Sequence, residues 1–171
     1  TVFRGFTEDA NEFTMSKICK ISNFISDLWR EFCVVVGVIN GKNRCMNIVV
    51  CVKQIPDPAS PGALDATTHA LKRDGKLILD ESDAYGVEMA LQLVATAGSG
   101  EVYVVSMAPN GETSGMRTAL AMGAVKGLLV SDPALAGSDA LTTAKILAAA
   151  VTKLGGADLI ITGTESSDGY T

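Results

Sequence analysis

The sequence predicts an α/β fold built on a doubly wound, mostly parallel sheet. Four short apolar runs, at 48–52, 102–107, 128–130 and 159–161, are continuous rather than alternating, which is typical of parallel strands covered on both faces. Segments with helical spacing of apolar residues separate these runs, and glycines follow the segments. Strand–helix–strand repetition with right-handed crossovers gives an open doubly wound sheet.

Three helices are expected between the strands. Asp83 can cap the first, which Gly98 ends; the second begins near Asn110 and ends at Gly123; the third runs from a Ser138 cap to the glycine pair at 155–156. The side chains expected to face the sheet are Val87, Ala90, Leu91, Val94, Met116, Ala119, Leu120, Leu141, Ala144, Leu147, Val151 and Leu154.

The connection between Pro56 and Asp80 interrupts this pattern. It contains three prolines and a glycine within seven residues, followed by a mixed stretch with Asp74-Gly75, a hairpin turn signal. Two interpretations stand side by side: a small antiparallel β-hairpin flap, or an ordered surface loop.

Composition changes abruptly near Met46. All five phenylalanines, the only tryptophan and three of the four cysteines precede it, whereas Ala, Gly, Val and Leu dominate afterwards. Residues 1–45 lack the features of a secretory signal, and their acidic residues argue against a mitochondrial presequence. We therefore expect a non-family extension, disordered or translated from upstream of a start at Met46, and a nucleotide-binding domain over 46–171.

Charge and cysteine usage exclude several classes of function. Residues 46–171 carry 8 basic and 14 acidic residues, a net charge of −6, which disfavours binding to nucleic acid or an anionic membrane. No apolar run approaches the roughly 20 residues that span a bilayer. The cysteines form no CxxC pair and His69 is isolated, so we expect no metal site and a reducing cytoplasm.

The last predicted strand runs into a loop of glycine and small hydroxyl residues, Gly163–Thr171. Such a loop exposes successive backbone N–H groups and suits a phosphate. If the strand order is 3-2-1-4, the ligand crevice lies between the first and fourth strands, flanked by residues 51–54 and by this loop. A βα loop should lead into a helix, so we expect the chain to be C-terminally truncated.

No catalytic machinery is evident. The GxxxxGK[ST], GxGxxG and GxSxG motifs are absent from the sequence, and His69 has no serine or cysteine placed for a triad. The carboxylates Asp80, Glu81 and Asp83 have two readings: caps of a helix, or contacts with a ribose or an adenine edge. Asp168 either closes a turn or belongs to a phosphate loop.

From Met46 onward, the sequence resembles the β subunit of electron transfer flavoprotein, whose fold is of the adenine-nucleotide α-hydrolase type. The matching stretches are Met46–Asp57, Ser106–Pro109, Arg117–Ala124, Gly137–Ala144 and Asp158–Thr171. They occur in the family's order and spacing. The chain departs from many relatives at Asp80-Glu81, where those have Asn-Pro, and at Val125, where an aspartate is usual.

The resemblance implies an electron-carrier subunit with no catalytic residues of its own. It would bind an α subunit, with which it shares an FAD, and hold AMP as a structural nucleotide, or a second FAD in bifurcating relatives. Electrons would pass from acyl-CoA and related dehydrogenases of fatty acid β-oxidation to a quinone reductase, in a bacterial cytoplasm. The alternative is a free-standing ATP- or AMP-binding domain of the stress-protein or nucleotide-hydrolase type; a purely structural interaction module is a third reading.

The resemblance also assigns residues to the nucleotide site. They lie at strand ends, at the entry to the first helix and in the phosphate loop: Cys51, Asp80, Glu81, Ser82, Asp83, Met107, Gly163, Thr164, Glu165, Ser166, Ser167, Asp168, Gly169, Tyr170 and Thr171.

Overall fold

A five-stranded sheet forms the centre of the molecule, with the order β1-β7-β2-β5-β6. The computed structural model describes residues 35–38, 45–59, 62, 64–67, 71–73 and 75–165. The strands are β1 (Val35–Val38), β2 (Met46–Cys51), β5 (Gly100–Met107), β6 (Lys126–Val130) and β7 (Leu159–Thr162). Strands β7, β2, β5 and β6 are parallel. The predicted doubly wound fold and its 3-2-1-4 strand order are confirmed.

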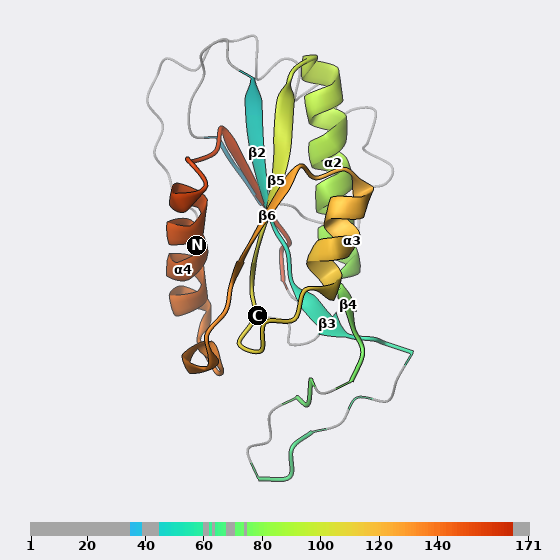
Figure 1. Ribbon diagram of the computed structural model, residues 1–171, viewed down its shortest axis with the longest axis vertical. Coiled ribbons are helices and arrows are strands. Elements are labelled where there is room, and N and C mark those ends of the chain that lie inside the picture. Colours follow the sequence, from blue (N-terminus) through green and yellow to red (C-terminus); the bar gives the residue numbers. More distant parts are fainter. Residues whose placement is uncertain are drawn as a thin grey trace.

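Helices cover both faces of the sheet (Figure 1). Helices α2 (Glu81–Ala97) and α3 (Ser114–Met122) lie on one face, and α4 (Ala140–Lys153) lies on the other; a short 3₁₀ helix, η1 (Pro133–Leu135), precedes α4. This arrangement follows from right-handed crossovers. From β2 the chain adds β5 and then β6 on one side of β2, and it then crosses back to form β7 on the other side. The last connection therefore runs in the opposite direction and covers the opposite face of the sheet.

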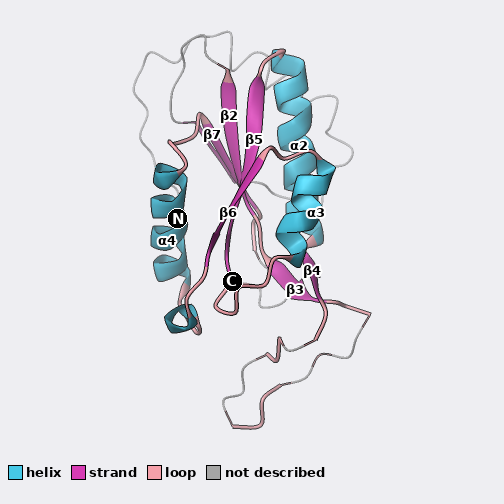
Figure 2. Cartoon of the chain, viewed as in Figure 1, coloured by secondary structure: helices cyan, strands magenta, loops and turns pink. Residues whose placement is uncertain are grey.

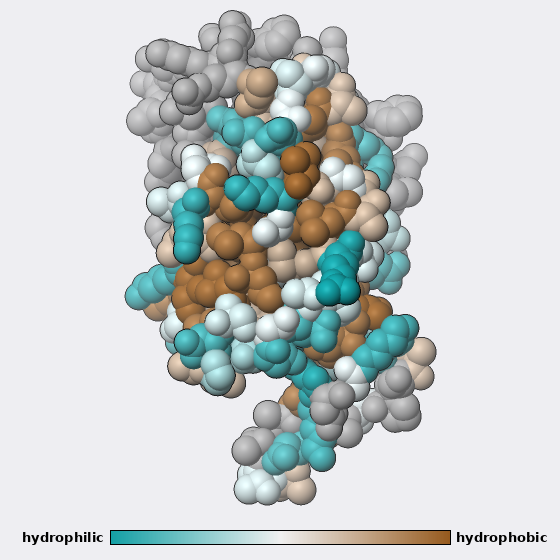
Figure 3. All heavy atoms as spheres, viewed as in Figure 1, coloured by the Kyte–Doolittle hydropathy of each residue, from teal (hydrophilic) through white to brown (hydrophobic). Residues whose placement is uncertain are grey.

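The core is divided into two apolar clusters by the sheet. Ile48 and Val50 of β2 face α2 and α3, whereas Val49 faces α4, and all three are essentially inaccessible to water. A strand buried on both faces explains the uninterrupted apolar run in the sequence. The edge strand β6 has no fully buried residue, and apolar side chains reach the surface beside α4 (Figure 3).

The helix boundaries differ from the predicted caps. Asp80, rather than Asp83, caps α2; Asp139, rather than Ser138, caps α4; and α3 begins at Ser114 after a Thr113 cap, later than expected. Gly98 ends α2 in the left-handed conformation, at φ 79°, as the sequence indicated. Neighbouring polar residues all satisfy the capping pattern, so sequence alone does not choose among them.

The prediction of inward-facing side chains was wrong at some helix positions. Val87, Ala90, Met116, Ala119 and Val151 are buried. Leu141 is 64% exposed, and Ala144 and Leu120 are also exposed. The buried residues of α4 are Ala150 and Val151, so α4 packs on the described core through its second half, and its first turns do not reach that core.

A small antiparallel pair lies beyond the carboxyl edge of the sheet (Figure 2). Strand β3 (Gln54–Pro56) pairs with β4 (Leu77–Leu79), so the expected antiparallel element exists. Its two strands flank the connection 57–76 and are not joined by a tight turn. An isolated bridge joins Leu64 to Leu71 farther out. Asp74 of the predicted turn lies outside the described residues.

The side chain of Gln54 fastens this pair to the start of α3. Its Oε1 accepts hydrogen bonds from Ser114 Oγ at 3.1 Å and Gly115 N at 3.0 Å, and its Nε2 donates to the Glu112 carbonyl at 2.5 Å. Ser114 Oγ also contacts the Leu77 carbonyl oxygen at 2.8 Å. A buried amide with its hydrogen-bonding groups engaged fixes the helix against the pair.

Strand β1 belongs to the segment that the sequence analysis set apart from the domain. Val35–Val38 pairs antiparallel with β7, in register from Val35↔Thr162 to Val38↔Leu159. The sequence did not predict a strand there. Residues 1–34 and 39–44, which we also expected to belong to a disordered or upstream-translated extension, lie outside the described residues. No helix in the described part of the chain is long and apolar enough to cross a bilayer.

We expect Gly115→Ala to destabilise the fold by about 1–3 kcal/mol. An added Cβ would lie 2.7 Å from Gln54 Cγ and 3.3 Å from Leu79 Cα, and Gln54 is held at both ends of its amide. Gly75→Ala is the matched control, because no other atom lies within 4 Å of a Cβ at that position. Urea denaturation measures both; equal midpoints for the two variants would contradict the tight packing at Gly115.

Candidate functional site

The candidate site lies at the carboxyl edge of the sheet, where β2 and β7 end side by side. In open α/β sheets, ligands bind at this edge where the strand order reverses, and the reversal here lies between β2 and β7. Three segments meet there: the residues after β2, the first turn of α2 and the residues after β7. Their contacts determine what the edge can bind.

Asp83 joins all three segments. Its Oδ2 accepts a 2.6 Å hydrogen bond from the backbone N–H of Lys53, which follows β2. Its Oδ1 lies 3.1 Å from the position that a Cβ on Gly163, directly after β7, would occupy. Asp83 is only 7% exposed. The glycine therefore allows β7 to end against a buried carboxylate.

Asp80 supplies the cap of α2 and a second link to the end of β2. Its Oδ1 accepts hydrogen bonds from Ser82 N at 3.0 Å and Ser82 Oγ at 2.7 Å, and its own N–H donates to the Lys53 carbonyl at 3.0 Å. Asp80 is 2% exposed. Asp80 is therefore the cap of α2, whereas Asp83 connects this helix to the end of β2.

Burial raises the pKa of the Asp83 carboxyl to about 7; the hydrogen bond from Lys53 N–H opposes this rise, and the nearby Asp80 charge adds to it. A carboxyl group loses hydration when it is buried, which disfavours its charged form. Perturbed carboxyl groups in a cleft are candidates for binding sites. Asp83 therefore changes protonation state near neutral pH, at the edge where a ligand would bind.

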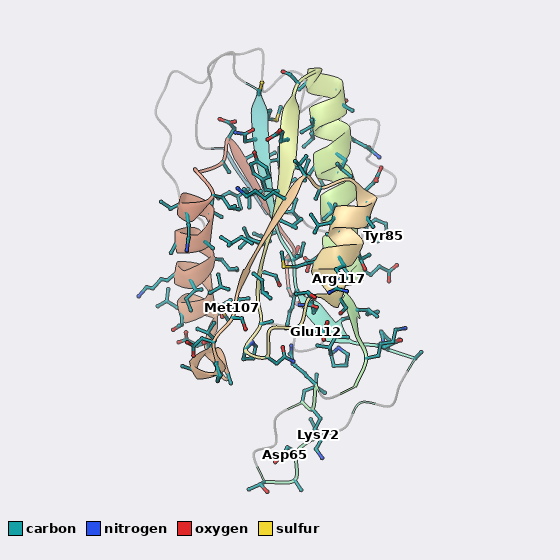
Figure 4. The ribbon with its side chains drawn as sticks, in the orientation of Figure 1. Asp65, Lys72, Tyr85, Met107, Glu112 and Arg117 are labelled. Atoms are coloured by element: carbon teal, nitrogen blue, oxygen red, sulfur yellow. The ribbon has the colours of Figure 1, made fainter. Side chains whose placement is uncertain are left out.

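Cys51 and Met107 end their strands at the same edge. Burial, with a contribution from the Asp83 charge, raises the pKa of the Cys51 thiol to about 11, so the thiol stays protonated and is not a nucleophile at neutral pH. Met107 is half-buried and pairs with Val130 of β6. It lies on the α4 side of the molecule, away from Tyr85 on α2 (Figure 4).

The other predicted site residues are exposed or lie outside the described residues. Glu81 is exposed, and its carboxylate accepts a 3.4 Å hydrogen bond from the Tyr85 hydroxyl. Thr164 and Glu165 are exposed after Gly163. Most of the predicted phosphate loop, Ser166 to Thr171, falls outside the described residues. The structure thus brings together Asp80, Ser82, Asp83 and Gly163, with Cys51 close enough to interact electrostatically with Asp83.

The sequence did not predict the contribution of the Lys53 backbone. Its N–H and carbonyl tie both aspartates to the end of β2. The position directly after a buried strand was the available signal, because backbone groups there leave the ladder and need other partners.

A separate hollow of about 790 Å³ opens at the opposite edge, between α4 and the amino ends of β2 and β7. Its wall includes Val151, Ile160 and glycines 155 and 156, and its one acidic side chain is Asp158. That carboxylate already accepts a 2.8 Å hydrogen bond from Asn47 N. Since ligands of such sheets bind at the carboxyl edge, we place the candidate site at Asp83 rather than in this hollow.

The described residues contain no cluster of three or more His, Cys, Asp or Glu side chains able to hold a metal ion. They do place the Asp83 carboxylate directly beside the backbone of Gly163.

The chain is similar in sequence to known proteins of one family. A family model described as the electron transfer flavoprotein domain matches residues 68–171. Protein FixA of Azorhizobium caulinodans is 39% identical over 130 residues, which cover 74% of this chain and 46% of the relative. The electron transfer flavoprotein subunit beta of Mycobacterium tuberculosis is 38% identical over 128 residues, covering 72% and 48%. The chain thus spans about half the length of the curated relatives it matches.

Asp83→Asn should make the stability of the ligand-free protein less dependent on pH. The folded protein keeps the Asp83 proton up to about pH 7 and the unfolded chain loses it near 4, so wild-type stability falls as pH rises through that window. Asparagine still accepts from Lys53 N–H and never ionises. We expect the variant to gain on the order of 1–4 kcal/mol relative to wild type between pH 5 and pH 8.

Denaturant titration at the two pH values measures this difference. Glu88→Gln, an exposed position on the same helix, is the control and should leave the difference unchanged. A wild-type stability that changes no more than that of Asp83→Asn would contradict the raised pKa.

Proposed function

The chain belongs to the electron transfer flavoprotein family as a β-type member, and on this basis we propose that it is the carrier subunit of a heterodimeric electron transfer flavoprotein. The observation that carries the proposal is the family model that matches residues 68–171, and it is supported by the contacts of Asp83 with the ends of β2 and β7 at the carboxyl edge. The role is electron transfer, which requires cofactor positioning rather than a catalytic side chain.

An adenine nucleotide at the carboxyl edge is the first part of the proposal. AMP would lie with its phosphate at the loop that begins with Gly163, whose glycine and small hydroxyl residues leave backbone N–H groups unshielded. Its hydroxyl groups would meet Asp83. In a bifurcating homologue, the adenine half of a second FAD would fit the same description, because it contains the same nucleotide.

Partners form the second part. We propose an α subunit that shares an FAD with this chain, acyl-CoA and related dehydrogenases of fatty acid β-oxidation as electron donors, and a quinone reductase as acceptor. The acidic balance of residues 46–171 supports protein partners with basic surfaces over nucleic acid. A cytoplasmic setting accords with the free cysteines Cys45 and Cys51, since a reducing compartment maintains free thiols.

Coexpression with an electron transfer flavoprotein α subunit tests the carrier role. We expect a yellow heterodimer whose denatured extract contains FAD and an adenine nucleotide, identified by mass spectrometry and by the visible spectrum. A chain that carries no flavin and does not bind the α subunit would overturn the proposal. A chain that retains ATP or AMP alone, without an α partner, would instead indicate a free-standing nucleotide-binding domain.

Gly163→Ala should lower nucleotide retention in that heterodimer. The added Cβ would lie 3.1 Å from Asp83 Oδ1 and 3.5 Å from Ser82 Oγ, crowding the carboxylate and the path of the backbone after β7. Gly75→Ala, with open space around its Cβ, is the control. The measurement is the molar ratio of adenine nucleotide to protein after gel filtration; equal ratios in the two variants would remove Gly163 from the site.

A further inference from the structure

Strand β1 covers the outer edge of β7. Val35–Val38 pairs antiparallel with Leu159–Thr162, and the strand order places β1 outermost, directly beside β7. The inner edge of β7 is occupied by β2, which pairs with it in parallel. A strand at a sheet edge presents a row of unpaired N–H and C=O groups on which another chain can pair. Among the described strands, β1 is the one that occupies this row on β7.

The two sides of the sheet differ in how their strands resist pairing with other chains. Strand β6 begins with Lys126 and is followed by Asp132 and Pro133, and charges and prolines at an edge discourage such pairing. Strand β7 reads Leu-Ile-Ile-Thr, with β-branched residues at three of its four positions and neither a charge nor a proline. Short uncharged segments of this composition are the ones that pair between chains. The sequence of β7 therefore offers no protection of its own.

The charge that directly precedes β7 is held on the side of β2. Asp158 Oδ2 accepts a 2.8 Å hydrogen bond from Asn47 N, and Asp158 N donates to the Asn47 carbonyl at 2.9 Å. Asn47 belongs to β2, so both contacts point away from the edge that β1 covers. Directly after the strand, Gly163 has no side chain to place at that edge. Protection of β7 thus depends on β1.

A short tether keeps β1 close to β7. Strands β1 and β2 flank β7 and run in opposite directions, so β1 ends and β2 begins at the same edge, where Val38 and Ile48 both pair with Leu159. Residues 39–45 join them across two strand spacings, roughly 10 Å, which lies well within the reach of a segment of that length. Such a tether gives the attached strand an effective concentration on the order of millimolar, so a separate chain at roughly micromolar concentration does not displace it.

We propose that β1 is a protective strand, which prevents β7 from pairing with the β7 of a second copy of this chain. The pairing with β1 is antiparallel, so this edge accepts an antiparallel partner. Two copies of β7 related by a twofold axis meet in that orientation, with Ile160 of each copy opposite Ile161 of the other. The second copy also offers the uncharged, β-branched composition that Val35–Val38 offers. Release of β1 therefore exposes a surface for self-association.

Strand β1 is better suited than β7 to be the last strand of the sheet. Gly37 lies inside it, and a glycine within a strand weakens further pairing. Lys42 and Arg44 follow it in the sequence, and like charges beside an edge oppose pairing with an identical chain. The segment before Met46 thereby gains a role, because it ends the sheet at a strand that resists further pairing.

Prolines in β1 test the proposal. Successive residues of an antiparallel strand direct their N–H groups to opposite sides, so either Val36 or Gly37 directs its N–H toward β7. The full chain carrying Val36→Pro and Gly37→Pro lacks that donor. We expect sedimentation equilibrium to give a dimerisation constant at least about 10-fold larger than that of the wild type, because two wild-type copies must both release β1 before they pair. Val36→Thr with Val38→Thr keeps every N–H group and a β-branched side chain at each position, and should associate as weakly as the wild type.

Hydrogen exchange of single amides locates the contact. In the wild-type chain the amides of Leu159–Thr162 should be protected equally at low and at high protein concentration, since β1 and β2 cover both sides of β7. In the proline variant, the protection of the alternate amides that face away from β2 should rise with protein concentration. The wild-type measurement needs no variant, so it tests the cover by β1 even where the proline variant does not fold.

Three results would overturn the inference. Equal dimerisation constants for the folded proline variant and the wild type would show that β1 prevents no association. Association of the proline variant without new protection in β7 would place the contact elsewhere, for example at β6. Alternate β7 amides that exchange in the wild-type chain as fast as those of an unstructured peptide would show that β1 does not cover the edge. None of these results bears on the carrier role, because the matched family model begins at residue 68, after β1.

Discussion

The backbone of Lys53 is the constraint on which the carboxyl edge depends. Its N–H donates to Asp83 and its carbonyl accepts from Asp80 N–H, so the two peptide groups that leave strand β2 are satisfied by the first turn of the next helix. Backbone groups need partners, and Lys53 lies between the end of β2 and the start of β3. The start of α2 is thereby fixed against β2, and the space between β2 and β7 is defined before any ligand binds.

Close approach at glycines completes this geometry. Gly86 of α2 packs directly on the sheet, where an added Cβ would meet Ile161 Cγ2 at 3.4 Å and Val50 Cγ1 at 3.5 Å, which are ordinary van der Waals distances. Gly115 allows α3 to meet the β3–β4 pair through Gln54. The positions of α2 and α3 are therefore set by small residues at contact points and by buried polar groups that orient them.

The fold was predictable because each parallel strand is a continuous apolar run, and continuity is a direct consequence of burial on both faces. The convergence of residues near 51–54 and 163 followed from strand order, and the family resemblance added residues 80–83. Other features depend on tertiary contacts that sequence periodicity does not contain. The choice of Asp80 over Asp83 as the cap, the exposed Leu141, the pairing of Gln54–Pro56 with Leu77–Leu79, and strand β1 are of this kind.

The same carboxylate that shapes the edge also works against the ligand-free fold. Burying Asp83 beside Asp80 raises its pKa, which means that the charged native state is penalised at neutral pH. A ligand that donates a hydrogen bond to Asp83 relieves part of this penalty and stabilises the folded state by linkage. Any molecule that lowers the pKa of Asp83 on binding would therefore make the folded state more stable at neutral pH, because it removes part of the free-energy cost of ionising a buried carboxyl.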